Sequence, residues 1–95
     1  MSPSGLELYR RTDQVLHYLW DPIGVAGIPE ARDEYHSYLP IIFSLVEKRD
    51  ASAIRAYLFH VEENEMGLTS NDLTRERITR AVELLLRWER VLRPL

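Results

Sequence analysis

Four side chains around the first break in the chain are of types that bind metal ions. His17 and Asp21 are four residues apart, and Asp33 and His36 are three residues apart beyond the break. If the intervening segment folds back, two imidazoles and two carboxylates converge, a ligand set that suits zinc or iron. The plainer interpretation makes His17 a structural residue beside a helix. We keep the metal site as an alternative hypothesis and predict no bound metal or cofactor.

The second half of the same segment carries more polar chemistry than packing requires. It offers two carboxylates, a phenol and an imidazole in succession, which are groups that contact other molecules. We predict a binding surface there, formed by Asp33, Glu34, Tyr35 and His36. The residues before it are interpreted as its scaffold: Trp20, Asp21, Pro22 and Gly24.

A third polar cluster, with His60, Glu62, Glu63 and Glu65, raises the possibility of acid–base catalysis. Such catalysis needs carboxylates held in a pocket with shifted pKa values. Adjacent glutamates on a helix point in different directions and normally stay in water. The chain also has no cysteine, no Gly-rich phosphate loop and no associated lysine motif. We therefore expect no enzymatic activity.

The break itself has the chemistry of a tight turn. A type I turn favours Asp at its first position, Pro at its second and Gly at its fourth, as in Asp21-Pro22-Ile23-Gly24. The connection from there to about Asp33 is long for a helical bundle. Its apolar residues predict a packed loop that closes one end of the bundle, with Trp20, Ile23, Val25 and Ile28 turned toward the core.

Amphipathic helical patterns surround this loop. The first recurs from Leu8 to Leu19 and stops at Asp21-Pro22, because the residue before a proline is disfavoured in the α region. The second, over 38–46, contains Pro40. Either Ser37 caps a helix with Pro40 in its first turn, or the helix starts near Asp33 and is kinked; a short helical turn over 30–36 and then a break is the version we favour.

Two further patterns complete the chain. The third begins after Asp50, a good N-cap residue, and ends at Met66, with Gly67 placed for a left-handed C-cap. The segment LTSND then offers caps for a fourth helix, whose apolar positions recur from Ile78 to Leu92 and which ends at Pro94. No stretch alternates with period two. The prediction is an all-α, four-helix bundle-like single domain over 1–95, with a long structured loop between helices 1 and 2.

Composition narrows the classes of function. The 95 residues are 45% hydrophobic and 28% charged, with a net charge of −3 and no cysteine, so disulfides and thiolate chemistry are excluded. The charge is too small to imply a nucleic-acid or membrane partner. No signal peptide or membrane-length apolar run is visible, and we expect a cytoplasmic protein.

The motif WDPIG at 20–24, followed beyond the loop by DEY at 33–35, resembles the signature of the YugE-like family. That family comprises short bacterial hypothetical proteins and is classed as a domain of unknown function. The resemblance implies a small helical domain and no activity, cofactor or catalytic residue. Relatives often have an acidic residue after the tyrosine, where this chain has His36.

The last helix differs in charge from the rest of the chain. Residues 75–95 contain six arginines and three glutamates, whereas 1–74 are acidic. A basic helix beside an acidic body can orient a protein partner or a second copy. We therefore predict a non-enzymatic protein–protein interaction module of an adaptor or immunity type, and a homodimer is possible. Apolar residues spread around this helix also favour self-association: Leu84, Leu86, Trp88 and Val91.

The alternative for the last helix is a solvated face. Glu76–Arg80, Glu83–Arg87 and Glu89–Arg93 have the i, i+4 spacing and order that stabilise a helix through ion pairs along its surface. Under this interpretation the charges pair within the helix, and the basic face contacts only water.

Overall fold

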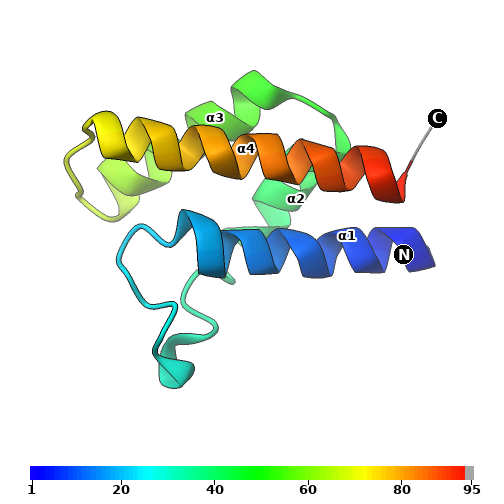
Figure 1. Ribbon diagram of the computed structural model, residues 1–95, viewed down its shortest axis with the longest axis horizontal. Helices are drawn as coiled ribbons and strands as arrows, with labels where there is room; N and C mark the ends of the chain where they lie inside the picture. Colours follow the sequence, from blue (N-terminus) through cyan, green and yellow to red (C-terminus); the bar gives the residue numbers. More distant parts are fainter. Residues whose placement is uncertain (94–95) are drawn as a thin grey trace.

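The computed structural model describes residues 1–93, and its main elements are four helices (Figure 1). These are α1 (Pro3–Gln14), α2 (Leu39–Glu47), α3 (Ala51–His60) and α4 (Asp72–Leu92). No strand occurs within the described part of the chain. The predicted all-α, bundle-like fold with a long loop after the first helix is confirmed.

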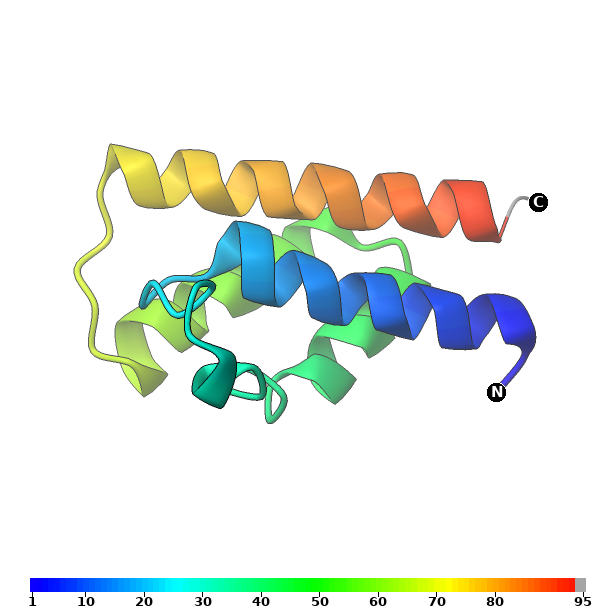
Figure 2. The ribbon, with the colours of Figure 1, turned by 60° about the horizontal axis from the view of Figure 1, so that its bottom comes forward.

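Helices α1 and α4 lie side by side and run in opposite directions, as both views show (Figures 1 and 2). Helices α2 and α3 pack behind them, so the four helices enclose one apolar core. The core is built from leucine, isoleucine and valine stripes at helical spacing together with Trp20 and Tyr35. The loop between α1 and α2 lies below the end of α1 (Figure 2).

The predicted helix boundaries after residue 47 are confirmed where the structure describes them. The Asp50 carboxylate accepts a hydrogen bond from the Ala53 N–H at 3.0 Å and caps α3. Gly67 has φ +67°, the left-handed conformation expected of a residue that ends a helix. Within the segment LTSND, Asn71 is the residue that caps α4. Helix α4 ends at Leu92, and Pro94 lies outside the described residues.

The position of Pro40 follows one of the two predicted alternatives. Helix α2 begins at Leu39, so Pro40 is in its first turn, where a missing N–H has no intrahelical partner to lose. The cap is Tyr38, without a side-chain hydrogen bond, so the assignment of Ser37 as the cap was wrong. Before it, a 3₁₀ turn at Pro29–Ala31 is followed by further turns, which confirms a break rather than a kinked helix.

Two helices change pitch before they end. Val15–Trp20 continues α1, and Val61–Glu65 continues α3, both as π-helix. Each segment ends with a hydrogen bond between residues five apart in the sequence. The Asp21 N–H donates to the Leu16 carbonyl at 3.0 Å, and the Met66 N–H donates to the Val61 carbonyl at 2.9 Å. π-Helical turns are rare, and they add a residue per turn and so change which side chains face the core.

The loop is only partly packed. Trp20 is completely buried, as predicted, but Ile23 is 43% exposed and Ile28 is 48% exposed. The expectation that both isoleucines face the core was wrong. What holds Ile23 to the rest of the chain is its backbone, because its N–H donates a hydrogen bond to the hydroxyl of Tyr35 at 3.2 Å. Within residues 1–93, no helix combines the length and the apolar character that crossing a membrane requires.

Two glycines of the loop provide a matched test of the turn. Gly24 has φ +71°, whereas Gly27 does not have positive φ, and a Cβ added at either position meets no atom within 4 Å. We expect Gly24→Ala to lower the free energy of unfolding by about 1–2 kcal/mol because an L-residue is strained in the left-handed region. Gly27→Ala should be neutral or slightly stabilising. Urea unfolding measures both; equal stabilities would contradict the turn geometry.

Candidate functional site

The loop is fastened to the end of the first helix by the Asp21 carboxylate. Oδ1 accepts hydrogen bonds from the Tyr35 hydroxyl at 2.7 Å and the Val25 N–H at 2.8 Å, and Oδ2 accepts one from the Ala26 N–H at 3.1 Å. The predicted turn is also present, since the Gly24 N–H donates to the Asp21 carbonyl at 3.2 Å. Asp21 itself adopts φ +31°, which aspartate tolerates better than most residues.

These contacts change the acid–base behaviour of both side chains. Partial burial alone raises the pKa of Asp21, but the hydrogen bond from Tyr35, the two backbone N–H groups and the nearby His17 together lower the pKa below its ordinary value. Burial and the hydrogen bond to Asp21 raise the pKa of Tyr35. Tyr35 therefore remains a neutral donor and Asp21 a charged acceptor at neutral pH.

A buried carboxylate joins three helical segments behind this loop. Glu62 is 1% exposed; its Oε2 accepts a hydrogen bond from Trp20 Nε1 at 2.8 Å, and its Oε1 pairs with Arg77 at 2.9 Å. Trp20 ends the first π-helical segment, Glu62 lies in the second, and Arg77 comes from α4. Both oxygens are occupied, so this glutamate is structural.

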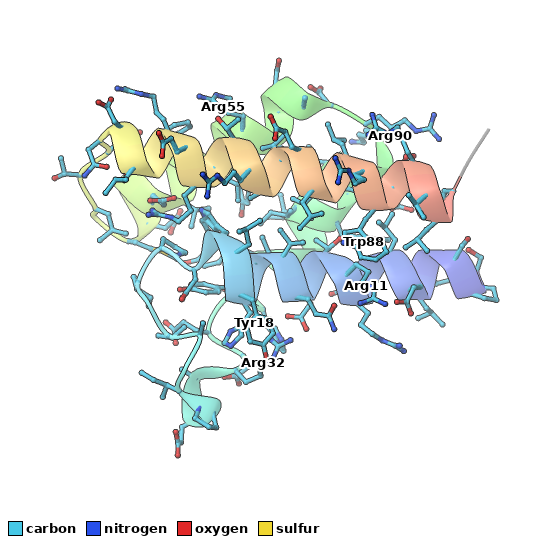
Figure 3. The ribbon with its side chains drawn as sticks, in the orientation of Figure 1. Arg11, Tyr18, Arg32, Arg55, Trp88 and Arg90 are labelled. Atoms are coloured by element: carbon cyan, nitrogen blue, oxygen red, sulfur yellow. The ribbon has the colours of Figure 1, made fainter. Side chains whose placement is uncertain are left out.

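A second polar cluster holds the far side of the loop against α1. Arg32 makes two hydrogen bonds to the Asp13 carboxylate, at 3.1 and 2.8 Å, and His36 Nε2 lies 3.1 Å from the same carboxylate. The guanidinium of Arg32 also lies over the Tyr18 ring, 5.3 Å from its centre (Figure 3). Asp13 thus neutralises the one arginine of the loop.

Beside this cluster lies a shallow pocket of about 310 Å³. Three polar side chains, His17, Tyr18 and Arg32, line it. The rest of the lining is apolar or glycine: Ala26, Gly27, Ile28 and Pro29. His17 is 2% exposed, and its Nδ1 is buried without a hydrogen-bond partner. The nitrogen is closed off from the pocket, and Arg32 is already paired, so the pocket presents no free charge to a ligand.

The four predicted metal ligands do not gather into a metal site. Among residues 1–93, no group of three or more His, Cys, Asp or Glu side chains is placed to hold an ion. The Asp21 oxygens are taken by the loop backbone and Tyr35, and His36 contacts Asp13 rather than Asp33. The alternative with His17, Asp21, Asp33 and His36 as ligands was therefore wrong, because the loop folds around Asp21 instead of around an ion.

The acidic cluster at the end of α3 is divided between the core and solvent. Glu62 points inward, whereas Glu63 and Glu65 are exposed. His60 Nε2 lies 3.6 Å from Glu65, and both side chains are more than half exposed.

The predicted binding residues 33–36 differ in their surroundings. Asp33 and Glu34 are exposed at the tip of the loop, and His36 is half exposed beside Asp13. Tyr35 is only 2% exposed, so it belongs with the scaffold rather than with the contact surface. Of the predicted scaffold residues, Trp20 is buried, Asp21 binds the loop backbone, Pro22 is partly buried and Gly24 has φ +71°. Asp13, which organises this surface, was missed; its position four residues before His17 was the only signal.

Most ion pairs of α4 are made across elements, and the pair along the helix is the exposed one between Asp72 and Arg75. The pairs Glu76–Arg80, Glu83–Arg87 and Glu89–Arg93 are all absent from the ion pairs within 4.0 Å among residues 1–93. Glu89 is 2% exposed and pairs with Arg49, while Arg93 pairs with Glu47 at 2.7 Å. The expectation of a helix with self-paired charges was therefore wrong.

What remains on the outside of α4 is a continuous exposed strip. We call it the α4 outer face: Leu73, Glu76, Arg80, Glu83, Arg87 and Arg90. Two depressions of about 250 and 300 Å³ run beside it, between α4 and the end of the first helix, and they share Leu19 and Arg80. Figure 3 shows Trp88 and Arg11 at the other end of this seam, with the guanidinium 4.5 Å from the ring centre.

Comparisons with protein families, curated proteins and solved structures found no match to this chain. The resemblance to the YugE-like family accordingly stays an expectation from its motif, and the function is argued from the geometry alone.

The lowered pKa of Asp21 makes a prediction about acid unfolding. In the unfolded chain the carboxyl titrates near its ordinary pKa of about 3.9. Its contribution to stability is therefore complete above about pH 5 and is lost as the pH falls through the lower folded-state pKa. Asp21→Asn should reduce stability at neutral pH and flatten the acid side of the stability curve. Urea unfolding across a pH series measures this. If the variant loses stability with falling pH as steeply as the parent, the lowered pKa of Asp21 is contradicted.

The buried carboxylate can be tested against its exposed neighbour. Glu62→Gln keeps an acceptor for Trp20 but leaves the Arg77 charge without its partner, so we expect a loss of about 3 kcal/mol in the free energy of unfolding. Glu63 is the next residue and is exposed, so Glu63→Gln should change stability by less than about 0.5 kcal/mol. Thermal and chemical unfolding compare the two, and similar effects would refute the central role of Glu62.

Proposed function

We propose that this chain is a non-enzymatic protein–protein interaction module and that the α4 outer face is its contact surface. The observation that carries the proposal is the set of five charged residues on this face that have no ion-pair partner within residues 1–93: Glu76, Arg80, Glu83, Arg87 and Arg90. Elsewhere on α4, Arg77, Glu89 and Arg93 are all paired with other elements.

The shape beside these charges supports the same surface. Leu19 and Leu84 line one of the two adjoining depressions, and Leu73, which is 69% exposed, lines the other. A protein contact typically combines such an apolar hollow with a charged rim. The depressions are shallow, which suits side chains of a partner better than an enclosed small molecule.

The charge balance indicates what kind of partner fits. The five unpaired residues of the face comprise two glutamates and three arginines, so both signs of charge are mixed along it. Nucleic acid, which carries one sign of charge along its whole length, would meet repulsion at every second position. A protein surface with alternating charges is the complementary partner.

The predicted loop tip is the competing surface. Asp33 and Glu34 are exposed there, but the neighbouring Arg32 and His36 are held by Asp13. The tip offers two carboxylates and no hollow lined by free charges, which is why we favour α4.

Site-specific photo-cross-linking tests the proposal. A photo-reactive phenylalanine analogue at Glu83 should capture a protein in lysate of the source cells, because Glu83 is at the centre of the face. The same group at Lys48, which is exposed on another side and has no ion pair among residues 1–93, is the control. A third position, Glu34, tests the loop tip. Adducts only at Glu34 would move the surface to the loop, and equal adducts at all three positions would remove the proposal.

A further inference from the structure

The α4 outer face has a charge order that is complementary to itself when the helix is reversed. Its six residues are separated alternately by three and four positions, and all are exposed. This is the spacing of a helix side that packs along a second helix over several turns. Within it, the order is glutamate, arginine, glutamate, arginine from Glu76 to Arg87.

We propose that this face binds the same face of a second copy of the chain, with the two α4 helices antiparallel. The inference rests on the proposed function and names its partner. A two-fold axis between positions 81 and 82 places Arg80 opposite Glu83 of the second copy and Glu76 opposite Arg87. Because a two-fold contact repeats every pairing, each of these two ion pairs occurs twice.

The direction of the second helix follows from the same charges. A parallel pair in register would set Arg80 against Arg80 and Glu83 against Glu83, and like charges at one interface repel. In the antiparallel register all four central residues meet the opposite charge. A uniformly acidic or basic partner would satisfy only half of them.

Apolar contacts accompany these ion pairs. In the same register, Leu73 lies opposite Arg90, whose side chain borders a cavity of about 230 Å³ together with Leu86. Leu19 and Leu84 flank the central charges. Leu73, which is 69% exposed, lines the same side of α4 as Leu19 and adds apolar surface at each end of the contact.

The position of α4 leaves room for this arrangement. In Figure 2, α4 runs along one edge of the molecule, with the other helices on a single side of it. Its buried residues lie on the opposite side from the outer face. A second α4 can therefore lie along its length without displacing α1, α2 or α3.

The first experiment measures dissociation of the dimer by sedimentation velocity over a concentration series. Arg87→Glu should weaken the dimer by at least about tenfold, because it turns both copies of the Glu76–Arg87 contact into repulsions. Adding Glu76→Arg to the same chain swaps the charges and should restore the parent dissociation constant to within about threefold. Lys48→Glu is the control and should leave it unchanged. Weakening without rescue would refute the register.

The second experiment reads the register directly. The chain has no cysteine, so single cysteines can be introduced without background. An oxidised mixture of Glu76→Cys and Arg87→Cys chains should give a disulfide-linked heterodimer. Glu76→Cys alone should not, because its two copies are about 16 Å apart along the helices at a rise of about 1.5 Å per residue. Equal cross-linking of the two samples would overturn the antiparallel arrangement.

The outcomes separate this inference from the proposed function. A parent chain that stays monomeric up to about 1 mM overturns self-association. If photo-adducts at Glu83 then contain a different protein, the interaction module stands with another partner. If adducts at Glu83 are absent as well, both proposals fail.

Discussion

One of the two buried carboxylates, Glu62, links the ends of the helices. Its charge is compensated by an ion pair, and an uncompensated buried charge would be strongly destabilising. Its two partners come from distant parts of the chain, Trp20 at the end of the first helix and Arg77 on α4. Both Trp20 and Glu62 lie in π-helical turns, whose extra residue per turn changes the direction of the side chains that follow. The two departures from regular helix thus meet at one hydrogen bond, between Trp20 and this carboxylate.

The same end of the molecule explains why the loop is ordered although its isoleucines are exposed. Burial of Ile23 and Ile28 contributes little, so order comes from polar contacts to Asp21 and Asp13. Asp21 accepts hydrogen bonds from the start of the loop and from Tyr35 near its end, which closes the loop on itself. Tyr35 then fills the space beside Trp20, with ring centres 5.3 Å apart. Asp and Tyr of the WDPIG and DEY motifs therefore act as one structural unit.

Features set by local chemistry were predictable from the sequence, and features set by distant contacts were not. The helices, the Asp50 cap, the Gly67 C-cap and the Asp21 turn depend on residues within a few positions of each other. The burial of Glu62 and Glu89 depends on partners 42 and 40 positions away, and no periodicity shows such pairs. Both glutamates were expected in solvent for that reason. The metal hypothesis was wrong for the same reason, because spacing in the sequence does not show which way a loop folds.

The arrangement of charge on α4 follows from how its inner side is satisfied. Arg77, Glu89 and Arg93 pair with Glu62, Arg49 and Glu47 on other elements, so these ion pairs hold the bundle together. The charges on the opposite side have no element within reach, and α1, α2 and α3 all lie behind the helix. Exposed pairs along one helix stabilise it by only about 0.2–0.5 kcal/mol, so helix stability alone gives little reason for the alternation of charge from Glu76 to Arg87. A contact with a second molecule whose charges are complementary to this order gives a stronger reason. The physical distinction between the two sides of α4 is therefore that one set of charges is satisfied within the chain and the other is available to a second molecule.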